Sequence, residues 1–277
     1  MINMNAALRL MRFHRPLPIL LILWPTYWGL FLGKAPSLKM IIIFTLGTLL
    51  MRAAGCVIND YFDRDLDGHI ARTKNRPLAE GSATPRQALG LFICLISLAA
   101  CLLFFLHPAT ILLAIIALCL ATLYPLAKRI THFPQLVLGL AFNFGLIMAY
   151  VQTNGQTSAA MFFWYCFAVI WTLLYDTEYA LMDYQDDLKR GIKSTAVFFG
   201  HHVFYFLKIL TCLLIAMLIA HLILLPQLQI SRSFLSLSSI LFLIWQWQTI
   251  KQSPQTQGLR VFNLHHWLGL AIFLLIL

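Results

Sequence analysis

Long apolar runs recur along the whole chain and are separated by short polar stretches. A helix needs about 20 consecutive apolar residues to cross the hydrocarbon core of a bilayer. Runs near that length predict membrane-spanning helices at about 17–33, 38–58, 88–106, 109–127, 134–152, 160–180, 203–225, 233–250 and 261–277. We therefore expect an all-α, polytopic membrane protein with nine transmembrane helices. These spans leave little room for a separate soluble unit, so residues 1–277 are expected to form a single domain.

The composition leaves too few charged residues for a soluble protein. Of 277 residues, 60% are hydrophobic and 11% are charged, whereas soluble domains carry about 25% charged residues. Such a chain cannot cover its surface with polar groups. Membrane lipid is therefore an expected partner.

The formal net charge of +10 is better explained by membrane topology than by nucleic-acid binding. Cytoplasmic loops of membrane proteins carry an excess of Lys and Arg. If the N-terminus is cytoplasmic, 15 of the 20 basic residues lie in loops on that side and three lie in loops on the other. This asymmetry predicts a cytoplasmic N-terminus and no nucleic-acid partner.

All ten acidic residues fall in two short windows. The first holds Asp60, Asp63, Asp65, Asp67 and Glu80, and the second holds Asp176, Glu178, Asp183, Asp186 and Asp187. Both windows lie at the ends of even-numbered spans, the second and the sixth, so the expected topology places them on the same side of the membrane. Ionisable residues at membrane depth are costly and usually functional.

The spacing within each window places side chains on one helical face. Asn59, Asp63 and Asp67 are four residues apart, as are Asp183 and Asp187. Like charges at this spacing repel, so a cation is expected to compensate. Oxygen ligands of this kind suit Mg²⁺, which takes one or two carboxylates together with phosphate oxygens and water. The alternative is that these acids are solvated loop charges that balance neighbouring Lys and Arg.

Basic residues accompany the acids at the same rim and could neutralise phosphate oxygens. They are Arg64, Lys128, Arg129, Lys189 and Lys193. Each could instead serve as a topology signal or contact lipid headgroups. Arg52 differs because it lies inside an apolar run, two helical turns before Asn59. It could be a counter-ion for the acids, or it could bind the carboxylate of an acidic co-substrate.

These windows resemble the motifs of the UbiA-type intramembrane prenyltransferases. Residues 59–67 (NDYFDRDLD) resemble the N-D-x-x-D-x-x-x-D signature of that family, and residues 183–187 (DYQDD) resemble its D-x-x-x-D motif. Four further segments resemble the bacterial 4-hydroxybenzoate polyprenyltransferases of ubiquinone synthesis: 51–60 (MRAAGCVIND), 72–78 (RTKNRPL), 124–129 (YPLAKR) and 191–195 (GIKST). One departure is Tyr184, where close relatives are expected to carry Arg.

The resemblance implies nine transmembrane helices around a central cavity, with a cytoplasmic cap over Mg²⁺ sites in the bacterial inner membrane. It implies that Asn59, Asp63, Asp67, Asp183 and Asp187 are metal-site residues, with Asp63 and Asp183 catalytic. Arg64, Lys128, Arg129, Lys189 and Lys193 would face the diphosphate, Arg52 would face the benzoate carboxylate, and Asn75 and Tyr124 would contact substrate.

The implied reaction moves a polyprenyl group from polyprenyl diphosphate to the ring carbon ortho to the hydroxyl of 4-hydroxybenzoate, and it releases diphosphate. Other acceptors, such as a naphthoate, homogentisate or haem, remain alternatives. A divalent-cation transporter could use the same carboxylates, although transport favours acids near the bilayer midplane.

Overall fold

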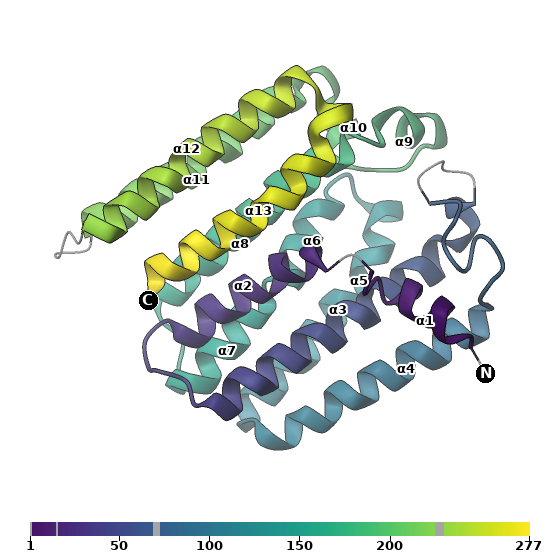
Figure 1. Ribbon diagram of the computed structural model, residues 1–277, viewed down its shortest axis with the longest axis horizontal. Helices are drawn as coiled ribbons and strands as arrows, with labels where there is room; N and C mark the ends of the chain where they lie inside the picture. The colour runs from purple at the N-terminus through teal and green to yellow at the C-terminus, as the bar shows by residue number, and fades with distance from the viewer. Residues whose placement is uncertain (1, 15, 69–72, 225–229) are drawn as a thin grey trace.

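The computed structural model describes residues 2–14, 16–68, 73–224 and 230–277, and within these ranges the chain is helical with no β-strand (Figure 1). The helices are α1 (Met4–Leu10), α2 (Leu17–Phe31), α3 (Leu38–Asp67), α4 (Pro85–Leu102), α5 (Pro108–Ile130), α6 (Pro134–Phe142), α7 (Phe144–Asn154), α8 (Ala159–Ala180), α9 (Tyr184–Arg190), α10 (Thr195–Phe199), α11 (Val203–Leu224), α12 (Ile230–Gln252) and α13 (Pro254–Ile276). Short 3-10 turns, η1 (Leu103–Phe105) and η2 (Gly200–His202), follow α4 and α10. The expected all-α class is confirmed.

The number of full-length spans is smaller than expected. In the described ranges, eight helical segments are long and apolar enough to cross a membrane, and α2 is a shorter apolar helix. The expected span at 17–33 contains only 15 helical residues, about 22 Å of helix. Pro16 and Pro18 lie at its start, and Gly33 follows its end with a φ of 108° that favours glycine. The prediction of nine full spans was therefore one too many.

The span expected at 134–152 is divided into α6 and α7 at Asn143. The Asn143 side chain donates to the carbonyl oxygens of Gly139 (2.7 Å) and Ala168 (3.1 Å) and to the hydroxyl of Thr172 (2.8 Å). Polar side chains can thus compensate for an interrupted helix within a membrane. The break does not prevent Pro134–Asn154 from being long enough to span.

The helices form a bundle in which α2–α8 and α13 surround a cavity, while α11 and α12 pack outside α8 and α13. α2 and α7 approach each other closely at Gly29. A Cβ atom built on Gly29 would lie 2.0 Å from the carbonyl oxygen of Leu146, so only glycine permits this helix contact.

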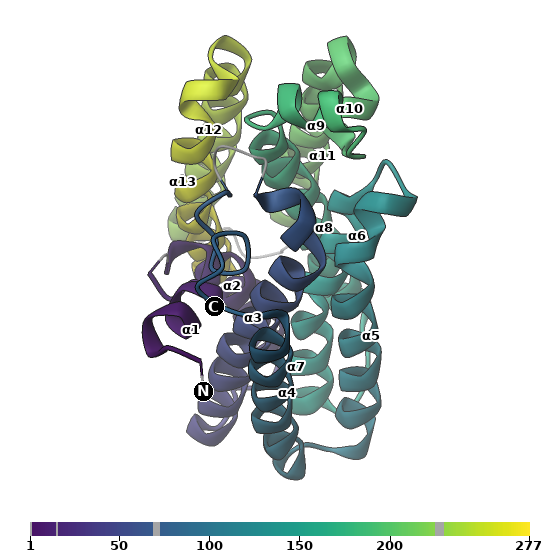
Figure 2. The ribbon, with the colours of Figure 1, turned by 90° about the vertical axis from the view of Figure 1, so that its right-hand side faces the viewer.

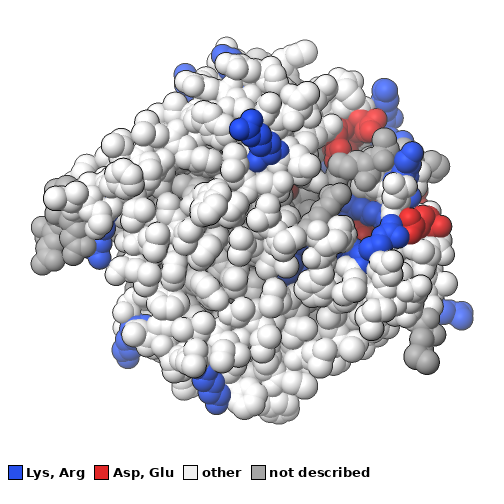
Figure 3. Space-filling model, viewed as in Figure 1, with Lys and Arg blue, Asp and Glu red and all other residues white. Residues whose placement is uncertain are grey.

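Charged groups gather at one end of the bundle. α3 has 30 residues, about 45 Å of helix, and therefore extends well beyond the expected span at 38–58. α1, α9 and α10 lie around this end (Figure 2). On the face shown in Figure 3, acidic side chains appear only there, with basic side chains beside them. This arrangement provides the expected cap over the cavity.

Candidate active site

One cavity of about 1280 Å³ lies among the helices and opens at the charged end. Along α3 its lining runs from Ile43 to Asp67, 24 positions or about 36 Å of helix. The lining is polar near Asp67 and apolar near Ile43, where it also includes Phe44, Leu106 and Met148. The cavity can therefore hold a long molecule with a charged head and an apolar tail.

The first acidic window forms one wall of the cavity mouth. Asn59, Asp63 and Asp67 all line the cavity, and both carboxylates are buried. The Asn59 amide nitrogen donates to the Asp63 carboxylate at 3.1 Å. Its other atom, the amide oxygen, is buried without a hydrogen-bond partner in the described part of the chain. Continuation of α3 through residue 67 produces the side-by-side arrangement that the spacing predicts.

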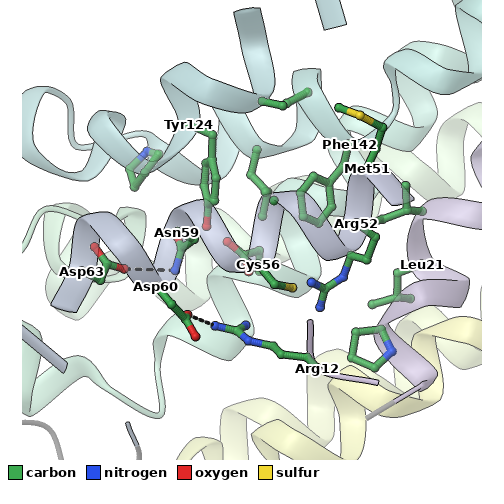
Figure 4. Close-up of a pocket in the computed structure, with 18 of the residues that line it drawn as sticks. Arg12, Leu21, Met51, Arg52, Cys56, Asn59, Asp60, Asp63, Tyr124 and Phe142 are labelled. Carbon is green, nitrogen blue, oxygen red and sulfur yellow. Dashed lines mark hydrogen bonds and ion pairs between the residues drawn. The ribbon is translucent and has the colours of Figure 1, made fainter. Parts of the chain in front are cut away.

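Two arginines from outside α3 neutralise part of this window. Arg76 places Nη1 2.7 Å from an Asp67 oxygen and 3.1 Å from an Asp60 oxygen. Arg12 follows α1 and places Nη2 2.6 Å from the same Asp60 oxygen (Figure 4). Burial raises the pKa of Asp67, an effect that Arg76 opposes. Burial also opposes protonation of Arg12, but the Asp60 carboxylate outweighs it and raises the pKa of Arg12.

The segment before the first span is tied to the loop after α3. Arg9 pairs with Glu80 at 2.6 Å and also donates to the carbonyl oxygen of Asn75. Hydrogen bonding to Glu80 raises the pKa of Arg9, and hydrogen bonding to Arg9 lowers the pKa of Glu80. Arg12 has a φ of 56°, which is rare for a residue other than glycine. These contacts hold the Arg12 side chain in the mouth.

The second acidic window forms the opposite wall of the mouth. α8 contributes Asp176, Asp183 precedes α9, and Asp187 lies within α9; all three line the cavity. α9 ends at Gly191, whose φ of 66° turns the chain back so that Lys193 also lines the cavity. The turn is anchored by Gln135, which accepts a hydrogen bond from the Thr195 backbone at 3.0 Å.

Midway along the cavity lies a smaller set of polar side chains, those of Arg52, Tyr124 and Tyr175. Arg52 points into the space, and its guanidinium faces that of Arg12 in Figure 4. The Nε atom of Arg52 is buried without a hydrogen-bond partner in the described ranges. Tyr124 and Tyr175 line the same region. Arg52 therefore lies between the acidic mouth and the apolar depth.

Some predicted residues do not join the cavity. Arg64 lies outside it, with its guanidinium 4.8 Å from the centre of the Tyr61 ring and 3.6 Å from Asp65. Lys189 is exposed on α9 and does not line the cavity. The structure therefore does not bring either residue to the cavity with the other predicted site residues. The Nη1 atom of Arg64 donates to the carbonyl oxygen of Tyr61 at 2.7 Å.

Two further predicted site residues line the cavity, and for Lys128 the side chain is not described. Arg129 and Asn75 line the cavity, and Arg129 also donates to the carbonyl oxygen of Phe62 at 2.8 Å. The side chain of Lys128, and the whole of Arg72, lie outside the described residues.

Several cavity-lining residues were not predicted as site residues: Arg12, Asp60, Arg76, Asp176 and Arg190. No spacing pattern in the sequence distinguishes these five residues as site residues. Asp60 and Asp176 belong to the acidic windows but fall outside their four-residue spacing. The arginines are brought in by turns and tertiary contacts that periodicity does not report.

The donor set at the mouth fits a hard divalent cation such as Mg²⁺. It consists of carboxylate and amide oxygens, and the unpartnered Asn59 oxygen offers a buried ligand atom. Among the described residues, no three Asp, Glu, His or Cys side chains form a ready metal-binding cluster. This is compatible with Mg²⁺, which is often held by one or two carboxylates, with substrate phosphate and water completing its shell.

Comparisons with known proteins define the class of this site. Residues 22–269 match the UbiA prenyltransferase family. The chain therefore belongs to the UbiA prenyltransferase family. Among curated relatives, it is 41% identical over 268 residues to 4-hydroxybenzoate octaprenyltransferase of Alkalilimnicola ehrlichii. The aligned region covers 96% of this chain and 91% of the relative.

Two solved structures share the fold. A UbiA homolog from Aeropyrum pernix K1 in its apo form has a TM-score of 0.81 at 21% identity, covering 93% of this chain and 96% of that chain. A UbiA homolog from Archaeoglobus fulgidus bound to GPP and Mg²⁺ has a TM-score of 0.74 at 20% identity, and the match covers 97% of this chain and 99% of that chain. The helical arrangement described above is thus the fold of this family.

Proposed function

We propose that this UbiA prenyltransferase transfers a polyprenyl group from polyprenyl diphosphate to 4-hydroxybenzoate and releases diphosphate, a step of ubiquinone biosynthesis. The acceptor carbon is the one ortho to the ring hydroxyl. The observation that carries the proposal is that both acidic windows, Arg52 and a long apolar depth line one cavity. The name of the 41% identical relative supports the choice of acceptor.

The mouth of the cavity suits the diphosphate. Asn59, Asp63 and Asp67 would hold Mg²⁺ from one wall, and Asp183 and Asp187 from the other. Bound Mg²⁺ would supply positive charge that stabilises the diphosphate as it leaves. Arg129 and Lys193 line the same mouth and would neutralise phosphate oxygens that the metal does not reach. Arg64 and Lys189 are not part of this proposal because they lie outside the cavity.

The depth of the cavity suits the polyprenyl tail and the reaction. Departure of diphosphate leaves an allylic cation, which water would capture in an open site. The apolar lining excludes water from that cation. The acceptor ring then attacks through the carbon ortho to its hydroxyl, and a carboxylate at the mouth, which we assign to Asp183, accepts the ring proton.

Arg52 suits the acceptor carboxylate. It lies between mouth and depth, its Nε is buried and unpartnered in the described residues, and a guanidinium binds a carboxylate through two parallel hydrogen bonds. A ring held by Arg52 would lie between the diphosphate head and the tail. The mouth is proposed to face the cytoplasm of a bacterial inner membrane, as the distribution of basic residues indicates.

The test is product mass spectrometry on purified protein in lipid vesicles. Polyprenyl diphosphates of several lengths are supplied with 4-hydroxybenzoate, a hydroxynaphthoate or homogentisate, with Mg²⁺ and with a chelator. We expect a prenylated 4-hydroxybenzoate that appears only with divalent metal. Transfer to another acceptor in preference to 4-hydroxybenzoate would overturn the acceptor assignment. Metal flux into vesicles without any prenyl product would favour the transporter alternative.

A further inference from the structure

Tyr175 of α8 carries a polar atom that no described residue satisfies. The side chain lines the cavity and is 1% exposed, and its hydroxyl lacks a hydrogen-bond partner in the described ranges. Thr172, one helical turn earlier, lies near this hydroxyl and also accepts a hydrogen bond from Asn143 at 2.8 Å. A buried, unsatisfied hydroxyl costs free energy. A hydroxyl of this kind beside a cavity indicates a ligand atom that would complete it.

The Tyr175 ring is held in place from several sides. Its centroid lies 5.4 Å from that of Trp171, 5.5 Å from that of His265 and 5.6 Å from that of Phe262. Trp171 donates to His265 at 2.9 Å, and His265 contacts Glu178 at 3.2 Å. These contacts connect α8 to α13 behind the ring. The hydroxyl is therefore presented by a rigid support.

Arg52 supplies a cation beside this hydroxyl. Arg52 is close enough to interact electrostatically with both Tyr175 and Tyr124. The charge of Arg12 also reaches Arg52. The acids of α3 begin at Asp60, eight positions beyond Arg52, whereas Asp176 follows Tyr175 directly on α8 and its charge also acts on Tyr175. A guanidinium with a neutral phenol donor beside it matches a carboxylate, which can accept hydrogen bonds from both.

We propose that the Tyr175 hydroxyl donates a hydrogen bond to the carboxylate of the ring acceptor and, together with Arg52, determines selection for an acidic ring. This inference rests on the proposed function and adds a specificity-determining residue to it. Trp171 and His265 are positioning residues, because they touch the Tyr175 ring and do not reach the acceptor. Deletion of the hydroxyl should weaken the use of acidic acceptors and leave the prenyl donor unaffected.

The experiment compares wild-type protein with Tyr175→Phe. Two acceptors with the same ring hydroxyl are used, 4-hydroxybenzoate and uncharged 4-hydroxybenzamide. A hydrogen bond to a charged group corresponds to about a 10- to 100-fold change in an equilibrium constant. We expect kcat/KM for the acid to fall by about that factor, mainly through KM. The amide and the diphosphate donor should keep their kcat/KM and KM within about two-fold.

Tyr165→Phe is the matched control. The Tyr165 hydroxyl donates to the carbonyl oxygen of Leu140 at 3.0 Å and does not line the cavity, so the acid-to-amide ratio should equal that of wild type. An unchanged ratio in Tyr175→Phe, with wild-type protein active on 4-hydroxybenzoate, would overturn this inference alone. A loss of equal size on acid, amide and donor would also overturn it, because that pattern indicates a general structural role. Wild-type inactivity on every ring acceptor would overturn the proposed function and this inference with it.

Discussion

The buried contact between Glu178 and His265 gives a sharp prediction about what holds α8 against α13. Both side chains are fully buried. The indole of Trp171 can only donate, so His265 Nδ1 must accept and cannot carry a proton. The imidazole is then neutral, with its proton on Nε2, and donates to Glu178. The contact is thus a hydrogen bond rather than an ion pair, and Glu178→Gln should preserve it through the amide oxygen.

The expected loss of stability depends on whether each variant keeps a hydrogen-bond acceptor for His265. Glu178→Leu strands the His265 Nε2–H in an apolar interior, where a lost partner costs about 1–3 kcal/mol. Hydrogen bonds between membrane helices average about 0.6 kcal/mol and reach about 1.7 kcal/mol. We therefore expect Glu178→Leu to destabilise the protein by about 1–2 kcal/mol. Glu178→Gln should stay within about 0.5 kcal/mol of wild type, because it keeps the acceptor and removes a group that is costly to bury in its charged form.

The assay is the apparent midpoint of thermal unfolding in detergent, read as the surviving monodisperse fraction after heating. For a domain of about this size, 1 kcal/mol corresponds to about 2–4 °C. Glu178→Leu should lower the midpoint by about 2–8 °C, and Glu178→Gln by less than about 2 °C. Equal losses in the two variants would refute the reasoning, because they would show that the contact needs the carboxylate charge.

Two further predictions concern helix packing and the mouth of the cavity. Gly29→Ala should prevent correct packing and sharply reduce the yield of monodisperse protein, because the new Cβ would lie 2.0 Å from the Leu146 carbonyl oxygen. Gly90→Ala is the control, because a Cβ built on Gly90 meets no other atom within 4 Å. This variant should be neutral or stabilising by up to about 1 kcal/mol. Equal yields of monodisperse protein for the two variants would contradict the close approach of α2 and α7. Arg76→Gln removes a cation from the mouth and should lower kcat/KM by about 10-fold or more in the vesicle assay. Arg64→Gln, outside the cavity, should stay within about two-fold, and the reverse order would contradict the placement of these two arginines.

Much of the fold could be predicted from the sequence because membrane spans depend on local composition. Apolar runs located the long helices, although α3 ends well beyond its expected span and α13 begins before its expected span. The four-residue spacing placed Asn59, Asp63 and Asp67 on one face. The short α2 and the break at Asn143 were missed. Both depend on backbone geometry and on polar contacts between helices, which hydrophobic periodicity does not encode.

The candidate site was predicted less completely because proximity in space comes from tertiary contacts. The two acidic windows meet around one cavity, as their spacing and expected topology suggested. Arg12 and Arg76 enter the same mouth from segments outside α3, and no local pattern distinguishes them from the other arginines in the loops of the chain. Arg64 lies outside the cavity, over the Tyr61 ring, although its neighbours Asp63 and Asp65 line the cavity.

Carboxylates from two separate helix ends are proposed to bind one diphosphate through Mg²⁺. The most direct measurement is the rate of Mg²⁺-dependent prenyl transfer in vesicles by Asp63→Ala and Asp183→Ala, with Asp186→Ala as a control that does not line the cavity. Both cavity variants should insert normally and lose about 100-fold or more in kcat, while the control keeps a rate close to wild type. Wild-type rates in either cavity variant would contradict the account.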